Sequence, residues 1–424
     1  MGGFAVSDLP AKPKRILVVS GPYPSIADTS RGIFVHQRVK ALSQIEGIEV
    51  QVVAPTPWAP PFPNIKKWRS LRRMPSTETY DGLIIHRPRY LLPPKVGGYF
   101  HPSLMYPSLL KAVRRIRKEF AFEVIDSHFV YPAGVAATRV ARRLGVPVSL
   151  TGRGEDMMRF PSMPLKGPRI RWALAHANRC VGVSKQISDE MVKHGADPSN
   201  VCTISNGVDT ERFYPKPSKK CQRLLGLPEN KKFLITVGDR LELKGFHIII
   251  EALPLILKTH PDLTYICVGG AGRHGQDFTP QIRSQIDRLG LNDRVVLVGA
   301  KSHDELVDWY NAADLYVLAS SREGSPNVLM ESLACGVPAV ATRVGSAPDE
   351  LEQSGFGFIM DERTPEAAAE AVIAALKHSW DRVAIRRAIE KRTWSCVADA
   401  TLKNLAPLFD LPSTKPGGKS RGEL

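Results

Sequence analysis

The stretch DLYVLASSREGSPNVLMESLACGVPAV, residues 314–340, contains the pattern that decides the fold. A short apolar run rich in β-formers leads into a polar loop, a helical pattern follows from about Pro326, and a second apolar run closes the stretch. Short apolar runs on both sides of a helix are typical of a β-α-β unit, in which parallel strands are buried on both faces. This stretch therefore predicts an α/β fold.

The same alternation extends along most of the chain. Apolar runs alternate with helical patterns from residue 15 to about residue 183, and again from residue 232 to about residue 342. Two such series predict two doubly wound, Rossmann-like domains, and 424 residues suffice for both. Ligands of such sheets bind outside the carboxyl ends of the strands. The polar, basic segment PKPSKKCQR (215–223) indicates a linker, and residues 365–408 are expected to be helical.

The charge of the chain is strongly positive and unevenly distributed. The formal net charge is +16, and much of the excess lies in 65–74, 111–120 and 139–145. A basic surface attracts nucleic acid or an anionic membrane. No nucleic-acid-binding motif accompanies the charge, and residues around Trp68 mix cations with apolar side chains, which favours a membrane surface. A solvated basic face is the alternative.

Neither a secretory signal nor a membrane-spanning segment is recognisable. The first 15 residues lack an apolar core, and no apolar run approaches the roughly 18 residues that a spanning helix needs. We therefore expect a cytoplasmic protein that attaches peripherally to the inner face of the plasma membrane through its basic N-terminal half.

One glycine-rich motif suggests a dinucleotide site, but its context argues against it. GAGRHG (270–275) fits G-x-G-x-x-G and follows an apolar run. In a true fingerprint the helix begins within the glycines. Here four residues intervene before a helix that is expected to start near Pro280. We interpret the segment as a glycine-rich loop of the active site.

The helix after the polar loop of 314–340 has the features of an anion site. Ser325 is suited to cap it and Pro326 to occupy its first position. The first backbone amides of a helix have no internal partner, and the helix dipole favours negative charge there. The amides of Asn327, Val328 and Leu329 are therefore expected to bind a phosphate.

Two glutamates flank this anion site. Glu331 lies about one turn too deep in the helix for a capping box, on the same side as Asn327 and Val328. A carboxylate in this position would repel phosphate but would accept hydrogen bonds from a ribose diol beside it. Glu323, in the loop before the helix, would reach hydroxyls on the other side. Two carboxylates around an anion site suggest a nucleotide-sugar clamp; ordinary surface charges at a strand–helix junction are the alternative.

Several blocks of the chain, in the same order, resemble one enzyme family. The block from Glu323 to Leu351 closely resembles the E-x7-E signature region of the retaining glycosyltransferases of family four, which have the GT-B fold. The form SREGSPNVLMESLACG is similar to a branch that acts in polysaccharide and teichuronic-acid synthesis. The other blocks that carry the resemblance are HFVYPAGVAATRVARRLGVPVSLTGRGEDM, VSKQISDEM, ISNGVDTERFYP, VGDRLELKGFHIIIEALP and WYNAADLYVLASSREG.

The resemblance implies a fold and a division of the chain. Two Rossmann-like domains would face a central cleft, and C-terminal helices would return to the N-terminal domain. The expected parts are a flexible N-terminus at 1–12, an acceptor-side domain at 13–205, a nucleotide-sugar donor domain at 206–385, a returning helical segment at 386–410 and a disordered tail at 411–424.

The resemblance also implies roles for residues of the donor domain. Glu323 would hydrogen-bond hydroxyls of the transferred sugar, and Glu331 would bind the ribose diol. Lys244 would neutralise the departing diphosphate. Arg240 stands one residue after the position where relatives have an arginine, so whether it reaches the diphosphate is open. The remaining donor-binding residues are expected to be Gly238, Ser302, Gly324, Ser325, Asn327, Val328 and Leu329.

Four further residues match family positions. His128 matches a histidine that approaches the donor sugar, and Asp156 a position near the reacting centre, with Glu155 beside it as a rival. Gly32 matches a first-loop glycine that lets the backbone approach a substrate. Asn206 would lie beside the cleft or serve as a turn residue. Simple packing is the alternative role for His128.

The implied activity needs neither a metal nor a cofactor. No D-x-D motif occurs in the sequence, so the helix dipole, Lys244 and Arg240 would do the work of a divalent cation. The implied reaction is metal-independent transfer, with retention, of a sugar from a UDP- or GDP-sugar to a glycan or lipid-linked acceptor in cell-surface polysaccharide or glycolipid synthesis. An epimerase or hydrolase of the same fold, or a non-catalytic sugar-nucleotide-binding protein, are the alternatives; nucleic acid is not expected as a partner.

Overall fold

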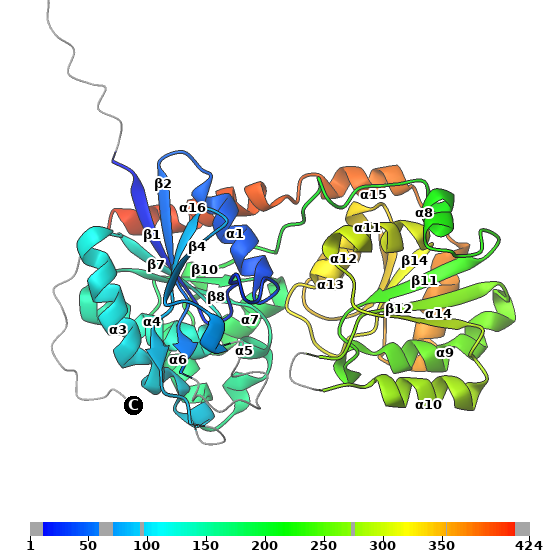
Figure 1. The fold of residues 1–424 in the computed structure, drawn as a ribbon, viewed down its shortest axis with the longest axis horizontal. Helices are drawn as coiled ribbons and strands as arrows, with labels where there is room; N and C mark the ends of the chain where they lie inside the picture. The colour runs from blue at the N-terminus through cyan, green and yellow to red at the C-terminus, as the bar shows by residue number, and fades with distance from the viewer. Residues whose placement is uncertain (1–11, 59–70, 94–96, 273–275, 353, 412–424) are drawn as a thin grey trace, which may run out of the picture. The chain divides into compact units, whose positions relative to one another are not determined.

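The computed structural model describes residues 12–58, 71–93, 97–272, 276–352 and 354–411 (Figure 1). The chain divides into two compact α/β units. The first takes its residues from Met1–Val181, Met191–Cys202 and Ala398–Leu424, and the second from Gly182–Glu190 and Thr203–Val397. Each unit is built on its own sheet of largely parallel strands. The prediction of two α/β domains with parallel sheets is therefore confirmed.

The sheet of the first unit has the strand order β10-β9-β8-β7-β1-β2-β5-β4. Strand β1 pairs in parallel with β7 on one side and β2 on the other, whereas β4 runs antiparallel to β5. The strands are β1 (Lys14–Ser20), β2 (Ile48–Val53), β4 (Thr77–Tyr80), β5 (Leu83–His86), β7 (Val124–His128), β8 (Val148–Gly152), β9 (Arg179–Gly182) and β10 (Val201–Thr203). A separate pair joins β3 (Thr56–Pro57) to β6 (Arg89–Tyr90).

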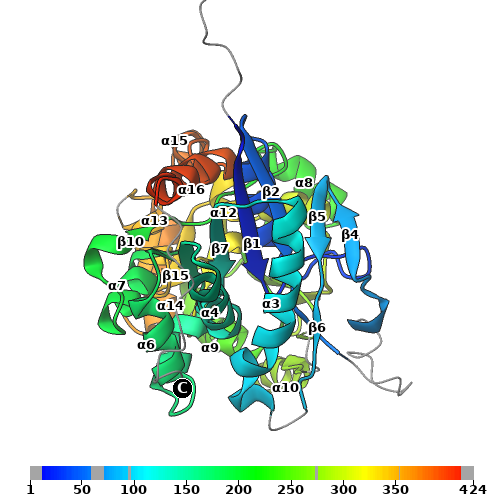
Figure 2. The ribbon, with the colours of Figure 1, turned by 90° about the vertical axis from the view of Figure 1, so that its left-hand side faces the viewer.

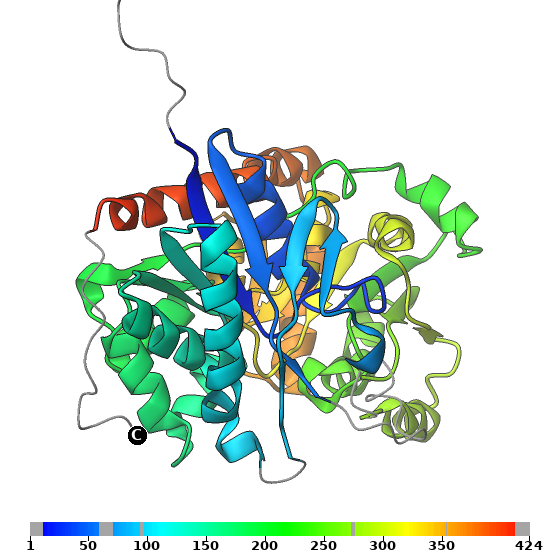
Figure 3. The same ribbon diagram turned by 60° about the vertical axis from the view of Figure 1, so that its left-hand side comes forward.

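Helices cover both faces of this sheet (Figures 2 and 3). One face carries α3 (His101–Glu119), α4 (Val135–Leu144) and α6 (Gly167–Ala175). The other face carries α1 (Ile33–Ser43) and α16 (Trp394–Phe409) side by side. The buried Arg38 of α1 donates from Nε to Thr401 Oγ1 of α16 at 2.9 Å, which ties the C-terminal helix to this unit.

The chain reverses its direction of winding between β1 and β7. From β1 it passes through α1 to β2 on one side, and from β7 through α4 to β8 on the other side. Such a reversal opens a crevice outside the carboxyl ends of the two strands, where ligands of doubly wound sheets bind. In the first unit this switch point lies beside His128 and the loop that leads to Gly32.

The second unit repeats the arrangement with six strands in the order β13-β12-β11-β14-β15-β16. The pairs along this sheet are parallel. Its switch point lies between β11, which is followed by β12 on one side, and β14, which is followed by β15 on the other. The strands are β11 (Lys232–Val237), β12 (Leu263–Val268), β13 (Val295–Val298), β14 (Leu315–Leu318), β15 (Ala339–Thr342) and β16 (Gly357–Met360).

Alternate residues of these strands supply two hydrophobic cores. Leu234 and Tyr265 point to the core under α9 (Phe246–Thr259), α10 (Thr279–Leu289) and α14 (Pro365–Lys377). Phe233 and Ile266 point to the opposite core, which α11 (His303–Ala312), α12 (Asn327–Ala334) and α15 (Arg382–Ile389) cover. Both faces are buried because apolar residues fill most positions of the strands. The remaining α-helices of the described residues are α5 (Glu155–Met158) of the first unit, together with α7 (Lys185–Lys193), α8 (Ser218–Leu224) and α13 (Ala347–Leu351).

One sequence prediction about connections was wrong, whereas the prediction that residues 365–408 are helical is confirmed. The expected linker 215–223 contains α8, and its Cys221 is buried inside the second unit. The helical segment 365–408 is three helices, because Asp381 caps α15 through the amides of Val383 and Ala384 and breaks the segment there. Arg386 then holds α15 on the second unit by donating to the carbonyls of Phe213, Ala334 and Thr210, and membership of the first unit starts at Ala398.

Some predicted features lie outside the described residues. These are the N-terminal segment up to residue 11, most of the basic stretch 65–74, the end of the glycine-rich motif at 273–275 and the tail from residue 412. The described part of that motif confirms that it does not open a helix, since α10 begins only at Thr279. Within the described residues, none of the helices combines the length and apolar character needed to cross a bilayer.

Candidate active site

Lys244 and Glu323 meet at the switch point of the second unit. Lys244 ends a short 3-10 turn that follows β11, and Glu323 lies in the loop that follows β14. Lys244 Nζ is 2.6 Å from Glu323 Oε1, and Ser320 Oγ donates to the same oxygen at 2.8 Å. The two side chains are only 23% and 15% exposed. Strands β11 and β14 are parallel neighbours, and the connections that follow them lead to opposite sides of the sheet. The loops after the two strands thus bring together two residues that are 79 positions apart in the sequence.

Glycines allow the close contacts that hold this pair. Gly245 has φ +75, and a Cβ there would lie 2.0 Å from the carbonyl oxygen of Ala319. Gly345 has φ +55, and its Cβ would lie 2.5 Å from the carbonyl oxygen of Gly324. Any other residue would separate the segments that carry Lys244 and Glu323. Gly238 lies against the aliphatic part of the Lys244 side chain, with which its Cβ would make an ordinary contact of 3.7 Å.

The helix that follows Glu323 starts one residue later than predicted. Helix α12 begins at Asn327, with Pro326 in the cap position and no side-chain cap. Ser325 does not cap the helix; its hydroxyl instead accepts a hydrogen bond of 3.3 Å from Ser346 Oγ. Leu329 N donates to the carbonyl of Pro326 at 3.1 Å. By helix geometry the amides of Asn327 and Val328 have no acceptor inside α12 and remain available to an anion.

Glu331 lies almost buried one turn further along α12. Its Oε2 accepts a hydrogen bond of 2.8 Å from the hydroxyl of Tyr310, and its Oε1 lies 4.0 Å from His303 Nε2. Burial raises the pKa of Glu331 to about 7, while the hydrogen bond from Tyr310 and the charge of Arg212 act in the opposite direction. The carboxyl group is therefore about half ionised near neutral pH.

A second pair of predicted residues is also in contact. Asn206 Nδ2 donates to Asn327 Oδ1 at 2.9 Å, and Asn206 is buried. The contact holds the segment of Asn206 against the first residue of α12.

Two other side chains that were predicted to bind the donor, Arg240 and Ser302, form hydrogen bonds within the protein instead. Arg240 donates from Nε to Thr279 Oγ1 at 2.8 Å and from Nη1 to the carbonyl of Val298 at 3.1 Å. Its guanidinium is thus bound at the end of β13 and the start of α10. Ser302 forms a capping box with Glu305 at the start of α11, which occupies its hydroxyl. No group of three or more His, Cys, Asp or Glu side chains suited to a metal ion occurs in the described parts of the chain.

The predicted residues of the first unit gather where β7 and β8 end. His128 is the last residue of β7 and is fully buried. Asp156, also buried, accepts hydrogen bonds from the amides of Val130 (2.8 Å), Arg153 (3.0 Å) and Gly154 (2.8 Å). Its carboxylate therefore joins the loop after β7 to the loop after β8. Glu155, its rival, has a side chain that is 54% exposed.

Gly32 stands in the position that only glycine tolerates well. Its φ is +68, and a Cβ would lie 2.4 Å from the carbonyl oxygen of Pro22. Gly32 precedes α1, so the chain turns sharply from the loop after β1 into the helix.

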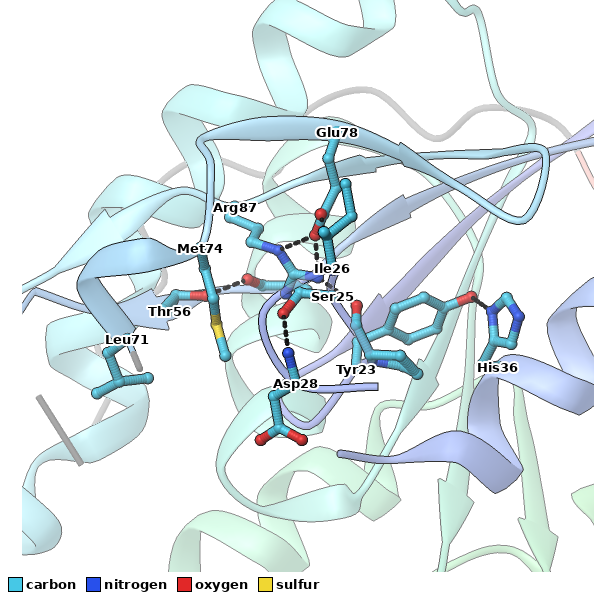
Figure 4. Close-up of polar contacts among 12 residues, drawn as sticks. Tyr23, Ser25, Ile26, Asp28, His36, Thr56, Leu71, Met74, Glu78 and Arg87 are labelled. Carbon is cyan, nitrogen blue, oxygen red and sulfur yellow. Dashed lines mark hydrogen bonds and ion pairs between the residues drawn. The ribbon is translucent and has the colours of Figure 1, made fainter. Parts of the chain in front are cut away.

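A buried ion pair holds the loop before Gly32 (Figure 4). Arg87 Nη2 lies 2.7 Å from Glu78 Oε1, and both side chains are almost fully buried. Glu78 Oε2 accepts a hydrogen bond of 3.2 Å from Ile26 N, and Arg87 donates to the carbonyl of Pro24. Tyr23 is held separately, with its hydroxyl 3.2 Å from His36 Nδ1. The contacts of Glu78 and Arg87 thus hold the loop through charged groups of the β4–β5 hairpin.

Sequence reasoning missed three residues of these clusters. Glu78 lies in β4 and Arg87 directly follows β5; the turn of this hairpin, at Asp81-Gly82, has positive φ at both residues. The Asp-Gly dipeptide is the signal that could have revealed the hairpin. Arg153 donates from Nη2 to His128 Nδ1 at 3.0 Å. Its place two residues before Glu155, inside a block already singled out, could have drawn attention to it.

Two family models match the chain, one for each half. The model for Glycosyltransferase Family 4 matches residues 32–212. The model for Glycosyl transferases group 1 matches residues 219–392. Together they span most of both units.

Relatives and solved structures agree with these matches. The putative teichuronic acid biosynthesis glycosyltransferase TuaC of Bacillus subtilis is 27% identical over 84% of this chain and 88% of its own length. The D-inositol 3-phosphate glycosyltransferase of Corynebacterium glutamicum is 30% identical over 52% of this chain, so the chain matches only about half (54%) of that relative.

Solved structures share the architecture of the chain. Sucrose-phosphate synthase from Thermosynechococcus elongatus has a TM-score of 0.72 at 19% identity, with 93% of this chain and 99% of that chain covered. Anabaena Alr3699/HepE in complex with UDP-glucose has a TM-score of 0.67 at 19% identity over 93% and 99%. At these identities the likeness concerns the fold. The two family models, the relatives and the pair of doubly wound sheets together identify the chain as a member of glycosyltransferase family four with the GT-B fold.

Proposed function

We propose that this glycosyltransferase moves a sugar from a nucleoside-diphosphate donor to a glycan or lipid-linked acceptor in cell-surface polysaccharide or glycolipid synthesis. The observation that carries the proposal is the Lys244–Glu323 pair, which lies at a switch point and just before the unpartnered amides of α12. The similarity to TuaC, a putative teichuronic acid biosynthesis glycosyltransferase, supports a role in polysaccharide synthesis, and the similarity to a complex with UDP-glucose supports a UDP-sugar donor.

The diphosphate would bind between Lys244 and the start of α12. The amides of Asn327 and Val328 would hold phosphate oxygens, with help from the helix dipole. Lys244 would stabilise the negative charge that develops on the departing diphosphate, which is the main electrostatic requirement of the reaction. The same ammonium group lies 2.6 Å from Glu323 and holds that carboxylate in position to accept hydrogen bonds from sugar hydroxyls.

Glu331 would receive the ribose. A diol can donate two hydrogen bonds to one carboxylate, and Tyr310 holds the carboxylate in place from the other side. Base recognition would use the backbone around Ala300–Ser302, since the hydroxyl of Ser302 is engaged in the capping box. Contact of the basic N-terminal half with an anionic membrane stays a prediction of the charge pattern.

A binding screen tests this proposal. Thermal-shift measurements with UDP-, GDP- and ADP-sugars are expected to find one donor class that raises the melting temperature of the wild-type chain. Glu331→Ala should lose most of that gain, since it removes the acceptor for the diol. Glu370→Ala, a change of an exposed glutamate on α14, should keep it. Equal stabilisation of both variants would contradict the assignment of Glu331.

Donor binding is expected to weaken below neutral pH. The diol donates its hydrogen bonds to the ionised form of Glu331, whose pKa is about 7. Both phosphates of a nucleotide sugar are esterified and stay ionised, so protonation of Glu331 should raise the donor Kd about tenfold between pH 8 and pH 6. Isothermal titration calorimetry over this range measures the effect. Glu331→Gln should bind more weakly with little pH dependence; an unchanged slope in this variant would assign the titration to another group.

We expect transfer with retention and without a metal. The described residues around Lys244 and α12 supply positive charge through a side chain and a helix terminus, and we nominate no carboxylate as a nucleophile for double displacement. A same-face mechanism, in which the leaving phosphate helps to deprotonate the acceptor, would retain the anomeric configuration. Activity should persist in excess EDTA, and proton NMR of the initial product should show the anomeric configuration of the donor. Inversion, or loss of activity that Mg²⁺ restores, would contradict this expectation.

A further inference from the structure

The switch point of the first unit contains a buried polar cluster formed by His128, Arg153 and Asp126. His128 ends β7 and Arg153 follows β8. Asp126, two residues before His128 on the same strand, is also buried. The start of α1, which follows β1, contributes Phe34. These groups lie where the ends of β1, β7 and β8 meet, which is the expected ligand position of a doubly wound sheet.

The hydrogen bond between Arg153 and His128 fixes the tautomer of the imidazole. A guanidinium group only donates, so His128 Nδ1 must accept the 3.0 Å hydrogen bond from Arg153 Nη2. The ring proton is then on Nε2, which lies 3.4 Å from Asp126 Oδ2. Burial and the charges of Arg153 and Arg38 lower the pKa of His128 well below its usual value. The ring stays neutral, and its only lone-pair nitrogen is already bound to a cation.

Arg153 is held through both its guanidinium and its backbone. Its Cζ lies 5.3 Å from the centre of the Phe34 ring, in a cation–π contact with the first turn of α1. Its own backbone amide is bound by Asp156. Arg153 retains 7% of its exposure whereas His128 has 0%. Of the two residues, Arg153 is therefore the less buried.

We infer that Arg153 contacts an anionic oxygen of a substrate and that His128 is its positioning residue, acting by hydrogen-bond acceptance at Nδ1. The inference rests on the proposed function of this sheet edge in substrate binding. The oxygen belongs to a phosphate or a carboxylate, of either the donor or an acidic acceptor. If it belongs to the donor, the donor KM rises in Arg153 variants even when water replaces the acceptor; if it belongs to the acceptor, hydrolysis of the donor alone is unaffected and only transfer declines.

Two amides distinguish positioning through Nδ1 from direct contact through Nε2. Asparagine places its Oδ1 where His128 has Nδ1, and glutamine places its Nε2 near the position of His128 Nε2. With the nucleotide sugar that stabilises the wild-type chain in the thermal-shift screen, Arg153→Gln should lower kcat/KM for transfer about 10- to 100-fold, as expected for a lost charged hydrogen bond. His128→Gln should lose about as much, and His128→Asn should recover most of the loss. The double variant H128Q/R153Q should be no worse than R153Q alone.

Control measurements show whether a loss of activity comes from misfolding, and they test the tautomer of His128 independently of the proposed function. Arg387→Gln, on an exposed part of α15, should match the wild type, and melting temperatures of H128N and H128Q should be similar. In ¹⁵N-histidine NMR, His128 should have an unprotonated Nδ1 and should not titrate between pH 5 and pH 8.

Three results would overturn the inference. The first is activity retained in H128Q but lost in H128N, and the second is a protonated Nδ1. The third is full transfer activity of R153Q. The NMR measurement needs no substrate, so absence of turnover with every nucleotide sugar would count against the proposed function alone.

Discussion

Lys244→Met is expected to lower kcat about 10²- to 10³-fold, the range observed when one preorganised group that stabilises developing negative charge is removed. The ammonium group lies 2.6 Å from Glu323 and next to the loop that leads into α12. Methionine keeps most of the side-chain volume beside Gly238 but removes the ammonium group that is proposed to neutralise the departing diphosphate. Steady-state kinetics of nucleotide release in the presence of acceptor measure the effect.

The variant also removes the partner of Glu323, so a control is needed. Lys258→Met, an exposed change near the end of α9, should leave kcat within about twofold of the wild type, as surface substitutions usually do. Lys244→Arg keeps the charge and should recover part of the loss. A Lys244→Met enzyme with normal kcat and a raised donor KM would mean that the lysine only assists binding.

Arg87→Met is expected to lower the free energy of unfolding of the first unit by about 3–5 kcal/mol. The change leaves the Glu78 carboxylate, 2% exposed, without its 2.7 Å partner. It also removes the donor to the carbonyl of Pro24, so the loop before Gly32 should loosen and activity should decline with it. Denaturant titration followed by hydrogen-exchange mass spectrometry measures the first unit separately from the second.

The matched control replaces both charges. Glu78→Leu combined with Arg87→Met leaves no unpaired charge, and such replacements of buried pairs are often nearly neutral. The double variant should therefore be more stable than Arg87→Met alone, although its loop still lacks the hydrogen bonds to Pro24 and Ile26. If the single variant were as stable as the wild type, the pair would not anchor the loop.

The sequence was most informative where the local pattern and the topology agree. Apolar runs identified the strands around β11 and β14, and family blocks pointed to Lys244 and Glu323, whose contact the structure contains. Contacts with distant partners were less accessible. Nothing near Arg240 in the sequence indicates that Thr279 and the carbonyl of Val298 accept its hydrogen bonds. Ser325 matched a capping pattern, but Ser346 engages its hydroxyl.

The first unit was harder to predict because its edge is not made of repeated β-α-β units. Strand β4, the antiparallel partner of β5, has the polar sequence TETY, so no apolar run indicates it. Its Glu78 looks like a surface charge until Arg87 is placed beside it. In the same way, His128 was assigned from a resemblance, while its burial and its bond to Arg153 depend on β7 and β8 being neighbours.

Helix α16 makes the first unit discontinuous in the gene, and this affects its synthesis. Thr401, Leu405 and Leu408 of α16 are buried, and Thr401 bonds the buried Arg38 of α1. While the ribosome is translating the second unit, the first one exposes this apolar face and a cation that lacks its partner. The first unit can therefore finish folding only after nearly the whole chain has emerged from the ribosome. A fragment that stops at residue 202 would leave this apolar surface exposed, and we expect it to bind chaperones or aggregate.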